Sequence, residues 1–210
     1  MHMTFLLYDG VEPVDLAAIG VISMAKRIIP ELSFETVSFD LAPVTLANGL
    51  QVLPTRAFHQ VDTVDTLLVP GGPGWRVAAH DHRIVQFVKR VAPSALVCSV
   101  CTGAMILAEA GILEGLSATT KFEVVAPERS PLAELQECFP AVDSSKALVV
   151  DNGRVVTGGG VTLCIDATLY LLEKRYGAEA ADEVARIMEY RSARAANLSR
   201  FAAAQPERVA

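Results

Sequence analysis

The sequence has no apolar run long enough to cross a membrane. Its apolar stretches are broken by glycine, proline or charge well before the roughly 18 residues that a transmembrane helix requires. It also lacks basic excess, since 18 lysines and arginines face 24 aspartates and glutamates, for a net charge of -6. Nucleic acids and anionic bilayers attract basic surfaces, so neither is an expected partner. The N-terminus has no signal-peptide pattern, and we expect a cytoplasmic protein.

Cysteine is scarce as well, with four among 210 residues, and a cytoplasmic location would keep them mostly reduced. A chain of this length can build a core without disulfides or metal. Cys98 and Cys101 have the C-x-x-C spacing, but no second Cys or His pair completes a zinc site. We also disfavour a redox dithiol, because Cys98 falls inside a strand pattern.

Apolar strand patterns alternate with helical patterns along the chain. Strands are expected at residues 4–8, 33–40, 66–69 and 95–100 and in a hairpin around Asn152 and Gly153, and helices at 13–29, 83–91, 102–110, 161–177 and 178–190. Apolar strands separated by helices predict a mostly parallel sheet buried on both faces. The fold class is therefore α/β, a single-domain three-layer α/β/α sandwich over residues 1–190. Residues 191–210 are expected to form a C-terminal tail, exposed or held by a partner subunit.

Cys101 stands at the corner between a predicted strand and helix, followed by the small residues Thr102 and Gly103. Such a nucleophile elbow presents its side chain at the carboxyl edge of the sheet, where ligands of α/β proteins bind. The helix N-terminus would favour the thiolate and lower the cysteine pKa below about 8.5. The alternative is an ordinary buried cysteine.

Two glycine-rich loops should lie at the same edge. Gly71 and Gly72 belong to a loop that matches neither a dinucleotide fingerprint nor a P-loop, and we interpret its N–H groups as a wall facing Cys101. A simple tight turn is the alternative. Gly160 would let the backbone approach the site, and Thr162 would cap the next helix.

Four motifs carry a resemblance to a known family: VPGGPG, SVCTGAMILAEAGILEG, ATTKF and VVTGGGVTLCIDATL. Together they resemble the ThiJ/PfpI superfamily, which is class I glutamine amidotransferase-like, over residues 5 to about 190. The resemblance implies a flavodoxin-like sheet, a cysteine nucleophile and a dimer. Cys-Thr-Gly is similar to the isocyanide hydratases and to the sensor half of certain AraC-type regulators. The protease-like branch has His after the Cys, so Thr102 disfavours a peptidase.

An acid near the start of the first helix belongs to the same pattern, and Asp15 in the VDL context supplies it. A thiolate that attacks carbon needs a proton donor and then a base for water. A carboxyl group beside a thiolate would have a raised pKa, which suits a donor. Glu12 is the competing candidate, and a helix N-terminal charge is the structural alternative for Asp15.

Lys121 is the main departure from the pattern, because His-Trp usually follows Ala-Thr-Thr in these relatives and this chain has Lys121 and Phe122. If Lys121 faces the pocket, it would favour the Cys101 thiolate and polar or anionic substrates. If it faces solvent, it is a surface lysine. No histidine of the chain is placed as an obvious base for Cys101.

The resemblance implies a hydro-lyase that converts an isocyanide to an N-substituted formamide, with Cys101 and Asp15 catalytic. Gly71, Gly72, Thr102, Gly160 and Lys121 would bind the small-molecule substrate, and no metal or organic cofactor is needed. The alternatives are a glyoxalase or deglycase acting on small dicarbonyls and a non-enzymatic redox or ligand sensor. The chain ends too early for the regulators' DNA-binding domain. Apolar residues of the helix at 162–176 and of the first helix also suggest a homodimer.

Overall fold

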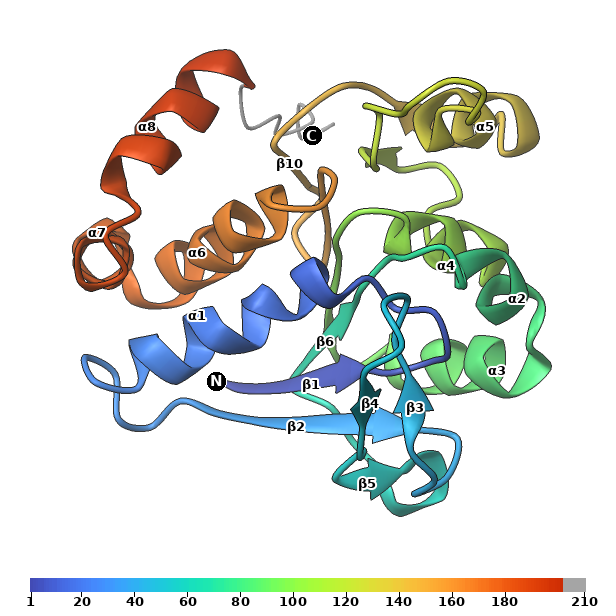
Figure 1. Cartoon of the computed structure of the whole chain (residues 1–210), viewed down its shortest axis with the longest axis horizontal. Coiled ribbons are helices and arrows are strands. Elements are labelled where there is room, and N and C mark those ends of the chain that lie inside the picture. The colour runs from blue at the N-terminus through green and yellow to red at the C-terminus, as the bar shows by residue number, and fades with distance from the viewer. Residues whose placement is uncertain (202–210) are drawn as a thin grey trace.

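A seven-stranded sheet runs through the centre of the computed structural model, which describes residues 1–201 (Figure 1). Its strands are β1 (His2–Leu6), β2 (Ser33–Ser38), β5 (Arg56–Ala57), β6 (Thr66–Val69), β7 (Leu96–Ser99), β10 (Val149–Asp151) and β11 (Val155–Gly158). Their order is β10-β11-β7-β6-β1-β2-β5. All neighbours pair in parallel except β10 and β11, which form the predicted antiparallel hairpin. The mostly parallel sheet is thus confirmed.

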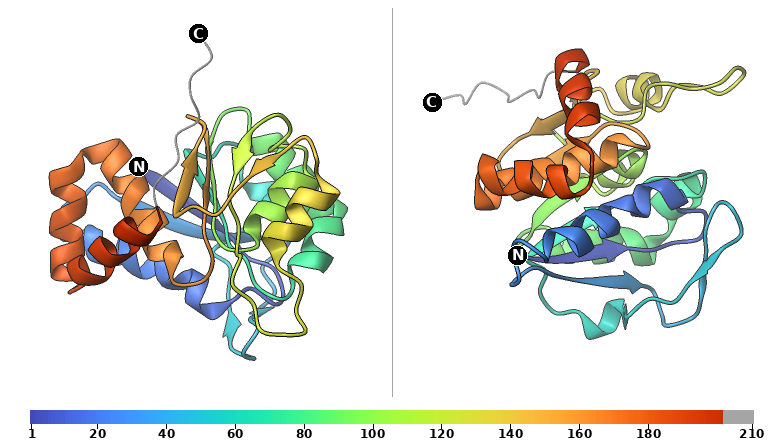
Figure 2. Two further views of the ribbon diagram at one scale, coloured as in Figure 1. Left: turned by 90° about the horizontal axis from the view of Figure 1, so that it is seen from above. Right: turned by 60° about the vertical axis from the view of Figure 1, so that its left-hand side comes forward.

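Helices cover both faces of this sheet. On one face lie α1 (Ala17–Ala25), α6 (Leu163–Tyr176) and α7 (Ala178–Ile187), and on the other α2 (Trp75–His80), α3 (His82–Val91) and α4 (Gly103–Glu109). Seen from above, α6, α7 and α8 (Arg191–Arg200) stand on one side and α2 to α5 (Pro131–Cys138) on the other (Figure 2, left). The three-layer α/β/α sandwich is confirmed.

Alternation along the strands divides the apolar side chains between two cores. Phe5, Leu68 and Cys98 pack with α1, α6 and α7, whereas their neighbours Leu6 and Leu67 pack with α2, α3 and α4. Because successive strand side chains point to opposite faces, a strand with helices on both sides must be apolar throughout. All four residues of β6 are accordingly buried.

Shorter elements complete the described chain. They are the 3-10 turns η1 (Pro13–Leu16) and η2 (Phe58–Gln60), the hairpin of β3 (Val44–Thr45) and β4 (Gln51–Val52), and the parallel pair of β8 (Ser117–Ala118) and β9 (Asp143–Ser144). No helix among residues 1–201 is both long and apolar enough to span a bilayer.

The first predicted helix differs from the structure at its start. Instead of continuous helix from residue 13, the tighter turn η1 precedes α1, and Asp15 lies buried in that turn. Pro13 occupies the first position, and a Glu12 oxygen accepts the N–H of Val14 at 3.3 Å, so local capping starts the turn. This turn directs the Asp15 carboxyl inward.

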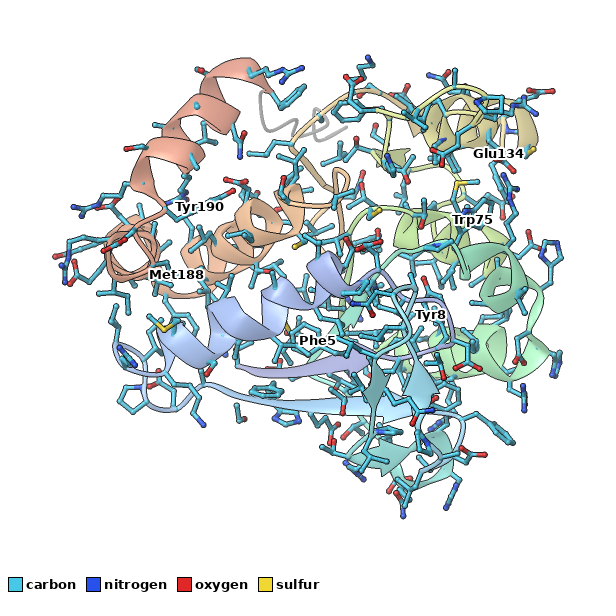
Figure 3. The ribbon with its side chains drawn as sticks, viewed as in Figure 1. Phe5, Tyr8, Trp75, Glu134, Met188 and Tyr190 are labelled. Carbon is cyan, nitrogen blue, oxygen red and sulfur yellow. The ribbon has the colours of Figure 1, made fainter. Side chains whose placement is uncertain are left out.

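The predicted tail begins as a helix. In α8, Asn197 donates to Asp166 of α6 at 2.8 Å, and the hydroxyl of Tyr190, which precedes α8, donates to the same carboxylate oxygen at 2.7 Å. Tyr190 and Met188 lie beside α6 and α7 in Figure 3. The rest of the predicted tail, residues 202–210, lies outside the described residues.

The surface argument for a dimer is wrong for α6. Its apolar residues belong to the core of this chain, because α1, α7 and the sheet cover them. The exposed large apolar side chains lie elsewhere, including Leu41, Leu50 and Leu53 around the β3–β4 hairpin. The dimer itself stays a prediction.

Gly103, the first residue of α4, gives a test of how tightly the elbow is packed. A Cβ built there would lie 2.0 Å from the carbonyl oxygen of Val69, so Gly103→Ala should destabilise the fold by about 1–3 kcal/mol. Gly20 of α1 is the control: a Cβ meets nothing within 4 Å, and Gly20→Ala should stabilise by about 0.5–1 kcal/mol. Urea unfolding measures both, and equal effects would contradict the close contact.

Candidate active site

Cys101 forms a sharp corner between β7 and α4. Its φ is 53°, in the left-handed region that residues with a Cβ rarely adopt. Hydrogen bonds hold the Cys101 backbone from both sides. The Cys101 N–H donates to the Gly159 carbonyl at 3.0 Å, and Thr120 Oγ1 donates to the Cys101 carbonyl at 2.7 Å. Strain maintained in this way is typical of functional positions. The predicted sharp corner between strand and helix is therefore present, and the role of Cys101 as a nucleophile stays a prediction.

Three loops that are distant in sequence meet at this corner. The Gly71 N–H donates to Asp15 Oδ2 at 2.7 Å, and the Gly72 N–H donates to Thr102 Oγ1 at 2.9 Å. A Cβ at Gly71 would lie 2.8 Å from the Cβ of Cys101, so only glycine permits this approach. The loop after β6 thus holds the side chains of both Asp15 and Thr102 in place.

The N–H groups that face the sulfur come from different residues than expected. Backbone N–H groups of Thr102 and Val161 interact with the Cys101 thiol, whereas those of Gly71 and Gly72 donate to Asp15 and Thr102. The two glycines therefore act on the site by positioning other side chains. Their predicted contacts with substrate stay predictions.

The predicted lowering of the Cys101 pKa is wrong for this structure. The residue is only 2% exposed, and burial raises the pKa of its thiol to about 12. The charge of Asp15 adds to this rise, while the N–H groups of Val161 and Thr102 and the charge of Lys121 oppose it. Desolvation of a thiolate thus outweighs the short helix α4.

Asp15 has the raised pKa that a proton donor requires. Its side chain is fully buried, and burial raises the carboxyl pKa from 3.8 to about 7, against the hydrogen bond from Gly71. Oδ1 has no hydrogen-bond partner among the described residues. A proton on Oδ1 would make this oxygen a donor. Near neutral pH, Asp15 and Cys101 can therefore share one proton as a coupled pair.

A pocket of about 480 Å³ opens above Cys101. Its walls are formed by Glu12, Gly72, Pro73, Trp75, Arg76, Cys101, Thr102, Lys121, Val124, Glu128, Arg129, Pro131 and Val161. Lys121 therefore faces the pocket, and not bulk solvent alone. Glu12 stands at its wall, half-buried, while Asp15 lies behind it. Within residues 1–201, no histidine contributes to this wall.

Gly160 lies against Lys121 outside this wall, in a neighbouring pocket that Lys121 also lines. A Cβ at Gly160 would lie 2.8 Å from Lys121 Cγ, so glycine leaves room for the lysine stem. Thr162 occupies the N-cap position of α6 but makes no capping hydrogen bond with its side chain, contrary to expectation. The loop before α6 is instead constrained at Val161, whose φ is 52°.

Sequence reasoning missed three residues near Cys101 and Asp15. Val161 gives no signal, because a β-branched residue is unexpected in the left-handed region. Tyr8 follows β1, donates to the Pro70 carbonyl at 2.9 Å, and has a pKa raised by burial and then by the charges of Asp15 and Cys101. The Cys164 thiol of α6 donates to the Val14 carbonyl at 3.3 Å, and its pKa is raised by burial and then by Asp15. The position of Tyr8 at a strand's carboxyl end was the available signal.

Fold and site together define an α/β sandwich with a cysteine at the nucleophile elbow and a buried acid beside it. The family model of the DJ-1/PfpI family matches residues 1–174, and the chain belongs to this family. It is 34% identical to an isonitrile hydratase of Pseudomonas putida over 191 residues, which are 90% of this chain and 78% of that protein.

Other proteins similar to this chain are named as transcriptional regulators or as DJ-1 proteins. The chain is 28% identical to the HTH-type transcriptional regulator GbdR of Pseudomonas aeruginosa, covering 89% of this chain but only 50% of the regulator. Among solved structures, a ThiJ/PfpI family protein from Pseudomonas syringae has a TM-score of 0.78 at 25% identity, over 95% of this chain and 86% of that one. Drosophila melanogaster DJ-1beta has a TM-score of 0.74 at 19% identity, over 89% and 96%, and shows the fold alone.

The burial of Asp15 predicts a pH-dependent effect on stability. A carboxyl whose pKa is higher in the folded than in the unfolded state stabilises the fold when protonated, and this contribution is lost as pH rises through about 7. Asp15→Asn cannot ionise at this position and so avoids the loss of stability. Between pH 5 and pH 8, the free energy of unfolding of the variant should therefore rise by about 2–3 kcal/mol relative to that of the wild type.

Urea unfolding at the two pH values measures this difference, with Glu128→Gln as a control that changes an exposed carboxyl at the pocket wall. The same pH response in Asp15→Asn and wild type would show that Asp15 ionises normally in the folded protein.

Proposed function

We propose that this chain is a hydro-lyase of the isocyanide hydratase type, which converts an isocyanide to an N-substituted formamide. The observation that carries the proposal is the pairing of Cys101 at a strained elbow with the buried carboxyl of Asp15. The 34% identity to an isonitrile hydratase supports it. A cytoplasmic location stays a prediction.

The reaction begins when Cys101 Sγ, as thiolate, attacks the terminal isocyanide carbon. Asp15 receives the thiol proton and delivers it to that carbon, which gives a thioimidate, Cys–S–CH=N–R. The carboxylate then removes a proton from water as the water adds to the same carbon, and the nitrogen is protonated. Collapse of the adduct breaks the C–S bond, releases R–NH–CHO and restores the thiol, so one water is consumed in each turnover.

The surroundings of the pair suit these steps. Oδ1 of Asp15 has no protein partner among the described residues and can hold the transferred proton, while Gly71 fixes Oδ2. The N–H groups of Thr102 and Val161 lie where they can stabilise negative charge on the sulfur. The Cys101 thiol transfers its proton to Asp15 as the sulfur attacks the bound substrate. The reaction therefore does not require a free thiolate to accumulate, in spite of the high thiol pKa.

The alternatives fit the site less well. A glyoxalase or deglycase with a histidine next to the nucleophile is disfavoured, because none lines the pocket in the described part of the chain. A thiol sensor oxidises readily when its cysteine is exposed and has a low pKa, and Cys101 has neither property.

Three variants test the assignment of the catalytic pair. Cys101→Ala should abolish formamide release, and Asp15→Asn should lower kcat by about 10²–10⁴-fold, because an amide cannot donate and then accept the proton. Glu12→Gln should change kcat by less than about fivefold, since Asp15 remains. Formamide release from several isocyanides is measured beside methylglyoxal consumption, and circular dichroism checks each fold.

The outcomes separate the candidates. A larger loss for Glu12→Gln than for Asp15→Asn would assign the acid to Glu12. Turnover of methylglyoxal without formamide release would favour the dicarbonyl enzyme. The absence of both activities would contradict both enzymatic functions.

A homodimer is the expected assembly. Leu41, Leu50 and Leu53 are each more than half exposed, so the β3–β4 side presents apolar surface that association could cover. Light scattering at micromolar concentration should give twice the chain mass of 22.4 kDa. The mass of a single chain would contradict the prediction.

A further inference from the structure

Three cations line the pocket above Cys101, and two of them are neutralised by carboxylates. Arg76 forms a bidentate ion pair with Glu134, with Nη2 2.7 Å from Oε2, which joins α2 to α5. Trp75 and Glu134 lie on the same side of the molecule in Figure 3. Arg129 pairs with Glu137. Both guanidinium groups therefore have carboxylate partners.

Lys121 differs from these two arginines. Its Nζ donates to the backbone carbonyl of Glu123, and no carboxylate of residues 1–201 lies within ion-pair distance of it. The Glu123 side chain lies instead 3.9 Å from Lys146. A neutral carbonyl satisfies one N–H of the ammonium without compensating its charge, so Lys121 retains the capacity to bind an anion.

The Lys121 charge acts on the catalytic pair. Burial raises the pKa of both Cys101 and Asp15, and Lys121 opposes the rise in each case. Lys121 and Cys101 line the same pocket, so a substrate bound there can contact both residues.

Gly160 packs against the base of the Lys121 side chain from the adjoining pocket. A Cβ at residue 160 would lie 2.8, 2.9 and 3.0 Å from Lys121 Cγ, Cβ and Cα. Because two of these atoms belong to the start of the side chain and the backbone, Lys121 could not avoid the contact by a rotation of its end. A side chain at residue 160 would therefore displace Lys121 from its present position.

Acidic residues at the same pocket do not cancel this site. Glu128 is exposed, and an oxygen of Glu12 accepts the Val14 N–H in the turn before α1. Glu12 raises the Asp15 pKa, whereas Lys121 lowers it, so the two charges oppose each other at Asp15.

We propose that Lys121 is the specificity-determining residue of this pocket and binds a carboxylate carried by the substrate next to the carbon that Cys101 attacks. Nζ would exchange its hydrogen bond to the Glu123 carbonyl for a charge-assisted one to the substrate. The inference deepens the proposed function and rests on its assignment of Cys101 as nucleophile, but not on the identity of the isocyanide.

Alkylation of Cys101 by two small reagents tests this proposal without requiring turnover. Iodoacetate and iodoacetamide form the same C–S bond and release iodide, but only iodoacetate carries a carboxylate. Peptide-resolved mass spectrometry gives the rate at Cys101 for each reagent at low ionic strength. Lys121→Met should lower the iodoacetate-to-iodoacetamide rate ratio by at least about threefold, well within the strength of a close ion pair.

Three further variants separate a specific contact from other causes. Lys121→Arg should keep the wild-type ratio within about twofold, because the charge remains. Gly160→Ala should lower the ratio as Lys121→Met does, because it displaces the lysine without removing it. Lys146→Met is the matched control: Lys146 lies over the Phe122 ring, 5.1 Å from its centroid, and outside the pocket wall, so the ratio should not change.

Each result supports or overturns the proposal. An unchanged ratio in Lys121→Met, or an equal fall in Lys146→Met, overturns it and leaves the proposed function intact. Cys101 that reacts with neither reagent overturns the nucleophile assignment and the inference together. A second measurement compares kcat/KM for isocyanoacetate and its methyl ester, whose ratio should fall at least about threefold in Lys121→Met.

Discussion

Burial of the Asp15 carboxyl against the Gly71 N–H is the constraint to which the rest of the site is fitted. The hydrogen bond between them is 2.7 Å long and leaves the other carboxylate oxygen without a partner among the described residues. Burial raises the carboxyl pKa to about 7, which keeps a proton available beside Cys101 near neutral pH. The turn that begins at Pro13 and the glycines after β6 hold Asp15 in this buried position.

The features that make the site reactive also destabilise the folded protein. A buried carboxyl without a full set of partners and a cysteine in the left-handed region both destabilise the folded state. The two apolar cores on either side of the sheet offset this, since they bury the strands on both faces. Two of the three non-glycine residues with positive φ in the described chain, Cys101 and Val161, line the pocket, whereas the third, Glu189, lies between α7 and α8.

Periodicity and glycine placement were sufficient to predict the layers, the parallel sheet and the elbow, because these depend on local patterns. Asp15 also followed from a short motif. The direction of its pKa shift was predicted correctly but for the wrong reason, because burial raises this pKa and the Cys101 side chain lowers it. The Cys101 pKa was predicted with the wrong sign, because the sequence showed the helix after it but not how completely the surrounding loops exclude solvent. Val161 and Tyr8 were missed, since neither residue type indicates this chemistry by itself.

The sequence by itself determined which residues could react: a thiol at a strand-to-helix corner, an acid at the start of a turn, and glycines where backbones must approach. The tertiary structure decided their electrostatics. Whether Lys121 faced the pocket or solvent could not be read from its neighbours in sequence, because the pocket wall that contains Lys121 is built from segments far apart in the chain, such as Glu12 and Cys101. Desolvation and charge act through space, so the protonation of Cys101 and Asp15 is fixed only when distant loops pack around them.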